Sequence, residues 1–187
     1  MVKRHDMSLP ISIQALWDEL LAVREEVLKE AEGLSQAQAD WHPSERDWSI
    51  GEILHHLTLA EINTGKLTTK LTREAAETGK LAPFPADVKA FNPLPPSPPG
   101  PAEAPPVVRP EQGHAIGQLL ADMTATRERS RQSIEKLGSA DPRPLTFKHF
   151  RLGDLNLAQW WMLQARHDRD HLQQLRTVKA SPGFPKA

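Results

Sequence analysis

The sequence predicts an all-α four-helix bundle with a long proline-rich crossover between its second and third helices. Four segments of the 187-residue chain repeat apolar residues at helical spacing, and no region is rich in strand signals. Eleven of the seventeen prolines fall between the second and third of these segments, at about 81–110. Neither flank of this insert has enough helices to close a core alone, so we expect one bundle domain over 1–187.

The first helix is predicted from about Ile11 to Glu32, where apolar residues keep a broad helical periodicity. Ser12 is the candidate N-cap and Gly33 the candidate stop. The many apolar positions on this helix also suggest homodimerisation through a helical face.

The second helix has the clearest start signal in the chain. Ser49-Ile-Gly-Glu52 has the spacing of a capping box, so the helix is predicted to begin at Ile50. Its periodic pattern continues to about Glu77, before Gly79. Trp48 directly precedes the box and is predicted to staple the helix to the core.

The remaining helices follow the proline-rich insert. The third is predicted from Gln112 or His114 to Leu137, and the fourth from an Asn156 N-cap, with Gln159 at the box position, to about Lys179. Between them, 144–153 alternates enough to form a loop or short strand laid against the bundle.

Composition and charge exclude several classes of function. With 39% apolar and 25% charged residues the chain is typical of a soluble globular protein. The formal net charge is −1 and the signs are interspersed, so we expect no nucleic-acid partner and no binding to an anionic membrane. No apolar run is long enough for a membrane span or a signal peptide, so we expect a cytoplasmic protein. The chain has no cysteine, which excludes disulfides, thiolate metal ligands and a cysteine nucleophile.

Two histidines stand four residues apart on the predicted fourth helix. At about 100° per residue, His167 and His171 lie in the same sector as Trp160, Trp161 and Leu175, so both imidazoles point inward. Burying two neighbouring imidazoles is costly unless each finds a partner. A divalent metal bound by both satisfies them together, and separate hydrogen bonds across the core are the alternative.

A third histidine lies on the second helix. His56 falls on the flank of that helix's apolar stripe, whereas His55 projects farther out and is predicted to be solvated or to support the ligands from outside. If the second and fourth helices are neighbours, His56 reaches His167 and His171. Three nitrogen ligands leave a coordination position open, as catalytic metal sites do.

These segments carry a family resemblance. The stretch Asp47-Trp-Ser-Ile-Gly-Glu-Ile-Leu-His-His-Leu57, followed by His167-Asp-Arg-Asp-His171, resembles the DinB/YfiT-like metal-binding superfamily over nearly the whole chain except the insert. The resemblance implies a four-helix bundle with a long crossover after the second helix. It also implies that His56, His167 and His171 are the metal ligands.

The resemblance and the ligand chemistry together predict a metal-dependent enzyme. The centre would activate a small thiol for transfer, or water for hydrolysis, on a small-molecule substrate. Because the chain has no cysteine, the thiol would come from a co-substrate. Zinc is the favoured ion, with nickel, iron or manganese also compatible with imidazole ligands. The alternative is a non-enzymatic, metal-binding or stress-associated helical-bundle protein.

Other polar residues near the predicted site have simpler interpretations. Glu52 could be a general base, but its capping role already accounts for it. Gln164 either orients a ligand or packs with its amide satisfied. Asp168 and Asp170 are predicted to lie mostly on the solvated side. The remaining charged and histidine residues of interest are expected to serve solubility or to lie in loops without a catalytic role: Arg166, Arg169, His5, His42, His114 and His149.

Overall fold

The computed structural model describes residues 9–100 and 103–186, and the predicted four-helix bundle is confirmed. Its long helices are α1 (Ile11–Ala31), α3 (Ile50–Glu77), α4 (Ile116–Leu137) and α5 (Leu157–Ala180). α3 packs against α4 and α5, and α1 packs against α5. None of the helices within the described ranges is both long and apolar enough to cross a membrane.

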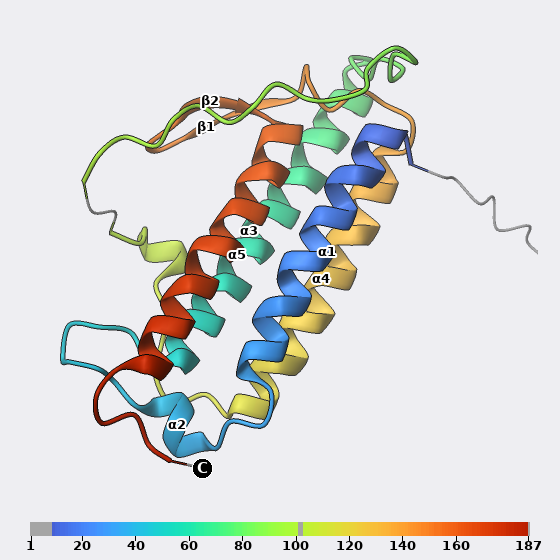
Figure 1. Cartoon of the computed structure of the whole chain (residues 1–187). Coiled ribbons are helices and arrows are strands. Elements are labelled where there is room, and N and C mark those ends of the chain that lie inside the picture. The colour runs from blue at the N-terminus through green and yellow to red at the C-terminus, as the bar shows by residue number, and fades with distance from the viewer. Residues whose placement is uncertain (1–8, 101–102, 187) are drawn as a thin grey trace, which may run out of the picture.

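The direction of the helices explains the long connection between α3 and α4. In Figure 1, α1 and α5 run one way along the bundle, and α3 and α4 run the other way. Since α3 and α4 are parallel, the chain between them must return along the length of the bundle. The proline-rich segment makes this return, and its described part contains only a three-residue 3-10 helix, η1 (Pro106–Val108), and an isolated bridge between Pro83 and Ala140.

The capping boxes predicted at the starts of α3 and α5 are present. Both reciprocal hydrogen bonds of the box are present at Ser49 and Glu52 and at Asn156 and Gln159. A third box, from Ser35 to Gln38, opens the short helix α2 (Gln36–Asp40), which was not predicted. That helix was missed although its sequence carries the same signal, because five residues are too few to show periodicity.

The predicted cap of α1 and the predicted start of α4 are wrong, whereas α1 begins at Ile11 as predicted. The N-cap of α1 is Pro10, without a side-chain cap; the Ser12 hydroxyl instead donates to the Val88 carbonyl at 2.9 Å. The Ser12 hydroxyl therefore binds the connection between α3 and α4 and does not cap α1. α4 begins at Ile116, later than Gln112 or His114, because the preceding residues continue the extended connection.

The segment predicted to be extended forms one strand of a hairpin. β1 (Thr146–His149) pairs antiparallel with β2 (Gly153–Asn156), with Phe147 opposite Leu155. β2 leads directly into α5, and the hairpin lies across one end of the bundle beside the connection (Figure 1). The connection is tied to this end, since Gln159 donates from Nε2 to the Pro93 carbonyl at 3.1 Å.

The interior is divided by a layer of buried charge. One hydrophobic cluster includes Leu20 and Trp161 toward the hairpin end, and the other includes Ile53 and Leu172 toward the α2 end. Between them, each long helix contributes one buried ion. We call these four side chains the charge layer: Arg24, Glu61, Arg127 and Asp168.

Candidate metal centre

Three histidines from two neighbouring helices meet beside the charge layer. His167 and His171 lie one turn apart on α5, and His56 faces them from α3. The Nε2 atom of His167 lies 3.0 Å from Nε2 of His56 and 3.2 Å from Nε2 of His171. The juxtaposition that the sequence predicted for these three side chains is therefore present.

Hydrogen bonds at Nδ1 fix the tautomers of His56 and His171. His56 donates from Nδ1 to the Val108 carbonyl at 2.6 Å, and His171 donates from Nδ1 to the Gln174 amide oxygen at 2.7 Å. An oxygen of this kind only accepts, so each Nδ1 carries the proton and each Nε2 keeps its lone pair. Outer hydrogen bonds of this type are typical of metal-binding histidines.

Burial keeps the three imidazoles neutral. Desolvation lowers the pKa of His56 to about 4, with smaller lowering contributions from the neighbouring histidines His171 and His55. Desolvation also lowers the pKa of His167 well below its ordinary value and lowers that of His171. Because only neutral imidazole binds a metal ion, the burial favours the ligand form at neutral pH.

Acidification is expected to destabilise the metal-free protein. His56 titrates near 6.5 when unfolded and at about 4 when folded, so between these values the unfolded chain binds a proton that the folded chain does not. The free energy of unfolding should thus be greatest above pH 6.5 and fall, by up to about 3 kcal/mol for this one histidine, as the pH drops toward 4.

Urea denaturation in the presence of a chelator, repeated across this pH range, measures the effect. His56→Gln removes the titrating group and should show a shallower dependence than the parent. An equal slope in the two proteins would contradict the buried neutral state of His56.

The histidine geometry fits a divalent ion. Tetrahedral ligation at a metal–nitrogen distance of about 2.1 Å separates two ligand nitrogens by about 3.4 Å. The two separations from His167, 3.0 and 3.2 Å, are close to that value, and all three nitrogens lie within 4.8 Å of one another. Within the described residues no carboxylate joins these three nitrogens, so the group has the three-ligand composition of an open site.

Trp48 borders the histidine group on the α3 side. Its ring centroid lies 4.8 Å from that of His56 and 6.0 Å from that of His171, and the indole is nearly parallel to the His171 ring. The indole also packs against the hydrophobic cluster at this end, as expected of a staple. The sequence prediction gave Trp48 only this packing role and missed its contact with two of the three histidines.

The prediction that Asp168 is solvated is wrong. Its side chain is fully buried and accepts hydrogen bonds from Arg24 Nε and Arg127 Nη2, both at 2.9 Å. Gln164 donates to the same carboxylate at 3.0 Å, which assigns its amide to the charge layer rather than to the histidines. At 100° per residue Asp168 falls in the same inward sector as Leu175. The prediction was wrong because it treated the charge as solvent-facing, whereas two buried arginines neutralise it.

Glu61 completes the charge layer from α3. Its carboxylate lies 2.9 Å from Arg127 Nε and 3.0 Å from Arg24 Nη2. The four charges cancel, so the layer has no formal net charge. The sequence prediction did not identify the partners of Glu61, because the pairing joins residues on four different helices.

The remaining histidines lie outside the three-histidine group. His55 accepts at Nδ1 from the Glu111 amide at 3.0 Å and packs against His114, so it binds the connection from the outer side of α3. His149 packs edge-on against Trp160 at the hairpin, with the ring centroids 5.2 Å apart. His5 lies outside the described residues.

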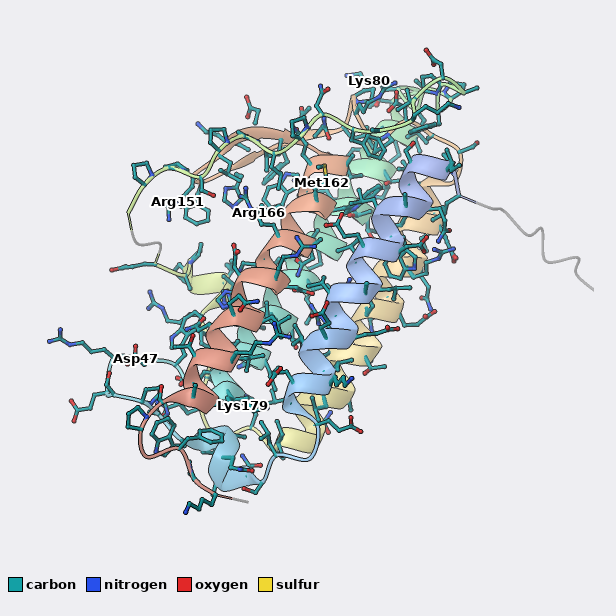
Figure 2. The ribbon with its side chains drawn as sticks, viewed as in Figure 1. Asp47, Lys80, Arg151, Met162, Arg166 and Lys179 are labelled. Atoms are coloured by element: carbon teal, nitrogen blue, oxygen red, sulfur yellow. The ribbon has the colours of Figure 1, made fainter. Side chains whose placement is uncertain are left out.

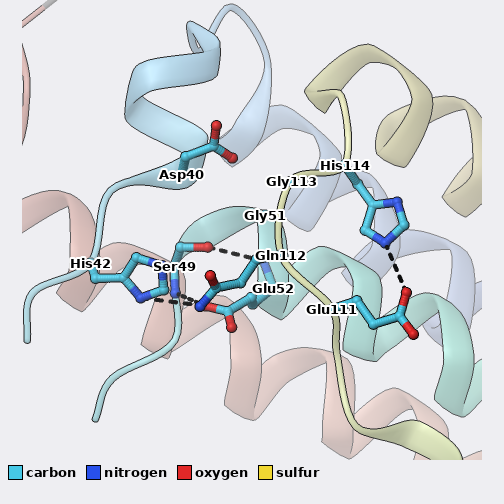
Figure 3. A pocket seen from close by; sticks show the side chains of 9 residues that line it. All are labelled: Asp40, His42, Ser49, Gly51, Glu52, Glu111, Gln112, Gly113 and His114. Atoms are coloured by element: carbon cyan, nitrogen blue, oxygen red, sulfur yellow. Dashed lines mark hydrogen bonds and ion pairs between the residues drawn. The ribbon is translucent and has the colours of Figure 1, made fainter. Parts of the chain in front are cut away.

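A cavity of about 330 Å³ lies at the N-terminal end of α3, one turn before His56. Figure 3 shows its lining, including Glu52, His42 and His114. Glu52 accepts the Ser49 amide at 2.8 Å, which confirms its capping role. We place the candidate site at the three histidines, because only there do several ligand atoms converge within the described part of the chain.

Comparison with known proteins gives three similarities. The family model of the DinB superfamily matches residues 19–175. The uncharacterized protein YuaE of Bacillus subtilis (strain 168) is 25% identical over 158 residues, which cover 83% of this chain and 92% of YuaE. The crystal structure of TT2238, a four-helix bundle protein, superposes with a TM-score of 0.60 at 21% identity, covering 88% of this chain and 98% of TT2238.

Proposed function

This chain belongs to the DinB superfamily, and from that premise we propose that it is a metal-dependent enzyme whose centre is His56, His167 and His171. One observation carries the proposal: three imidazole nitrogens from α3 and α5 converge, and no carboxylate within the described residues completes the set. A purely structural site would be expected to close its coordination with a fourth protein ligand.

Zinc is the ion that we favour. Three neutral nitrogens within 4.8 Å of one another can surround a tetrahedral ion, while nickel, iron and manganese also accept imidazole ligands. The proton on Nδ1 of His56 is held by Val108 of η1, so the proline-rich connection orients a proposed ligand.

The ligand set directs the chemistry that we propose. A divalent ion held by neutral ligands keeps its full charge and would lower the pKa of a water or a small thiol at its open position. The chain contains no cysteine, so a thiol would arrive as a co-substrate. Trp48 covers one side of the histidines and restricts access to them.

Metal content and metal-dependent activity test the proposal. Parent protein purified without a histidine tag or chelator is expected to contain close to one zinc per chain by mass spectrometry, and His167→Ala close to none. The parent, stripped and reloaded, is then assayed for transfer of mercaptoethanol to an electrophilic aryl halide and for hydrolysis of nitrophenyl acetate. Activity that needs zinc in either assay supports an enzyme and selects the reaction.

His42→Ala is the matched control. His42 lies outside the three-histidine group, where it donates to the Asp47 carbonyl, and its loss should leave metal content and activity unchanged. A parent without affinity for added zinc would refute the centre. A zinc-loaded parent inactive in both assays and in a wider screen of thiol acceptors and esters would favour the non-enzymatic metal-binding alternative.

A further inference from the structure

Arginines near the three histidines differ from most others in the structure. Seven arginines within the described ranges form ion pairs with carboxylates: Arg24, Arg73, Arg127, Arg131, Arg143, Arg169 and Arg176. Five others have no carboxylate partner among the described residues: Arg46, Arg109 and Arg129 are exposed, whereas Arg151 and Arg166 are partly buried. A partly buried cation without a counter-charge is costly, which suggests that a ligand supplies the negative charge.

Both arginines belong to elements that adjoin the candidate centre. Arg166 directly precedes His167 on α5, and Arg151 lies in the turn between β1 and β2. Figure 2 shows the two side chains on the side of the bundle where the hairpin overhangs α5. Arg151 is held there by neutral acceptors, since its Nη2 donates to the carbonyls of Pro98 at 2.8 Å and Gly100 at 3.2 Å.

The His149 ring lies beside both arginines. Burial lowers its pKa most, and the positive charges of Arg166 and then Arg151 lower it further, which shows that both guanidinium groups lie near this ring. The hairpin therefore brings Arg151 to the same imidazole as Arg166, which directly precedes His167 on α5.

We propose that Arg166, assisted by Arg151, binds the carboxylate or phosphate group of an organic anion whose reacting group lies at the three histidines. The inference rests on the proposed function and adds a substrate class to it. Guanidinium groups bind both kinds of anion through paired N–H donors.

Apolar surface beside the arginines favours an anion that has a carbon skeleton. Phe150 is 61% exposed and packs on His149, with their ring centroids 4.6 Å apart. Trp160 packs on the same imidazole and lies two helical turns from His167 on the same face of α5. A ligand that bridges the arginines and the histidines would pass this aromatic surface.

Cobalt-loaded protein provides the test, because a thiol that binds cobalt produces a charge-transfer absorption band. The probes are mercaptopropionate and mercaptopropanol, which have the same chain length and differ in charge. The parent is expected to bind mercaptopropionate about ten- to a hundredfold more tightly, as one charge-assisted contact allows. Arg166→Gln should abolish this preference, and Arg151→Gln should reduce it.

Arg169→Gln is the matched control, because this arginine lies on the same helix, is exposed and pairs with Glu19. It should retain the preference of the parent. Competition by acetate and by inorganic phosphate then distinguishes the two anion sources. Thermal unfolding of each variant verifies its fold.

Equal affinity of the parent for the two thiols, binding of neither, or a preference that survives in Arg166→Gln would overturn the inference. The last result would mean that the carboxylate binds the metal directly. Failure of the parent to take up cobalt, which is visible before any thiol is added, would instead refute the proposed function.

Discussion

Replacing Asp168 with alanine is expected to lower the free energy of unfolding by about 3–5 kcal/mol. The carboxylate accepts from Arg24 and Arg127 in a site without solvent access, so its removal leaves Arg24 and Arg127 with one carboxylate, Glu61, between them. Equilibrium urea denaturation of the zinc-free proteins at neutral pH measures the loss.

Asp170→Ala is the control for this experiment, since Asp170 is exposed on the same helix. Its effect should stay within about 0.5 kcal/mol. Asp168→Asn keeps the shape of the side chain but removes its charge. Its loss of unfolding free energy should lie between those of Asp168→Ala and Asp170→Ala. A loss no larger for Asp168→Ala than for Asp170→Ala would show that the charge layer does not hold the helices together.

Zinc is expected to stabilise the folded protein strongly through the three histidines. A ligand that binds only the folded state adds about 2.7 kcal/mol at a hundred times its dissociation constant and about 4.1 kcal/mol at a thousand times. The parent should show this gain in denaturation experiments at graded free zinc, and a chelator should reverse it. His171→Ala removes one of the three nitrogens and should lose most of the gain.

The chelated parent is expected to remain folded, because both hydrophobic clusters and the charge layer form without the ion. A chelated protein that unfolds would indicate that the metal has a structural role instead. A parent that gains no stability at any zinc concentration would contradict the assignment of these histidines as ligands.

Local signals in the sequence determined the helices and where several of them begin. A capping box needs only two residues three positions apart, so Ser49 and Glu52 fix the start of α3 without help from the rest of the chain. The box at Ser35 and Gln38 shows that the same signal could also have revealed α2. Ser12 was misassigned because its hydroxyl binds Val88, which lies 76 residues away.

The sequence also determined the candidate centre to the level of its three histidines. The four-residue spacing of His167 and His171 places both on one face of a helix. His56 joins them because α3 packs beside α5. Their outer hydrogen bonds could not be predicted from the sequence. Val108 lies on η1, and its carbonyl reaches His56 only because the proline-rich connection returns along the bundle.

Only the tertiary structure decided which charges are buried. Helical spacing places Asp168 and Glu61 on inward faces, but it does not identify the partners that stabilise a buried carboxylate, because Arg24 and Arg127 lie on two other helices. Helical periodicity and capping arise from contacts within a few residues, so the sequence alone determined the helices and the shared face of His167 and His171. A buried ion is stable only where several helices supply its partners, so the charge layer depends on how the whole chain packs.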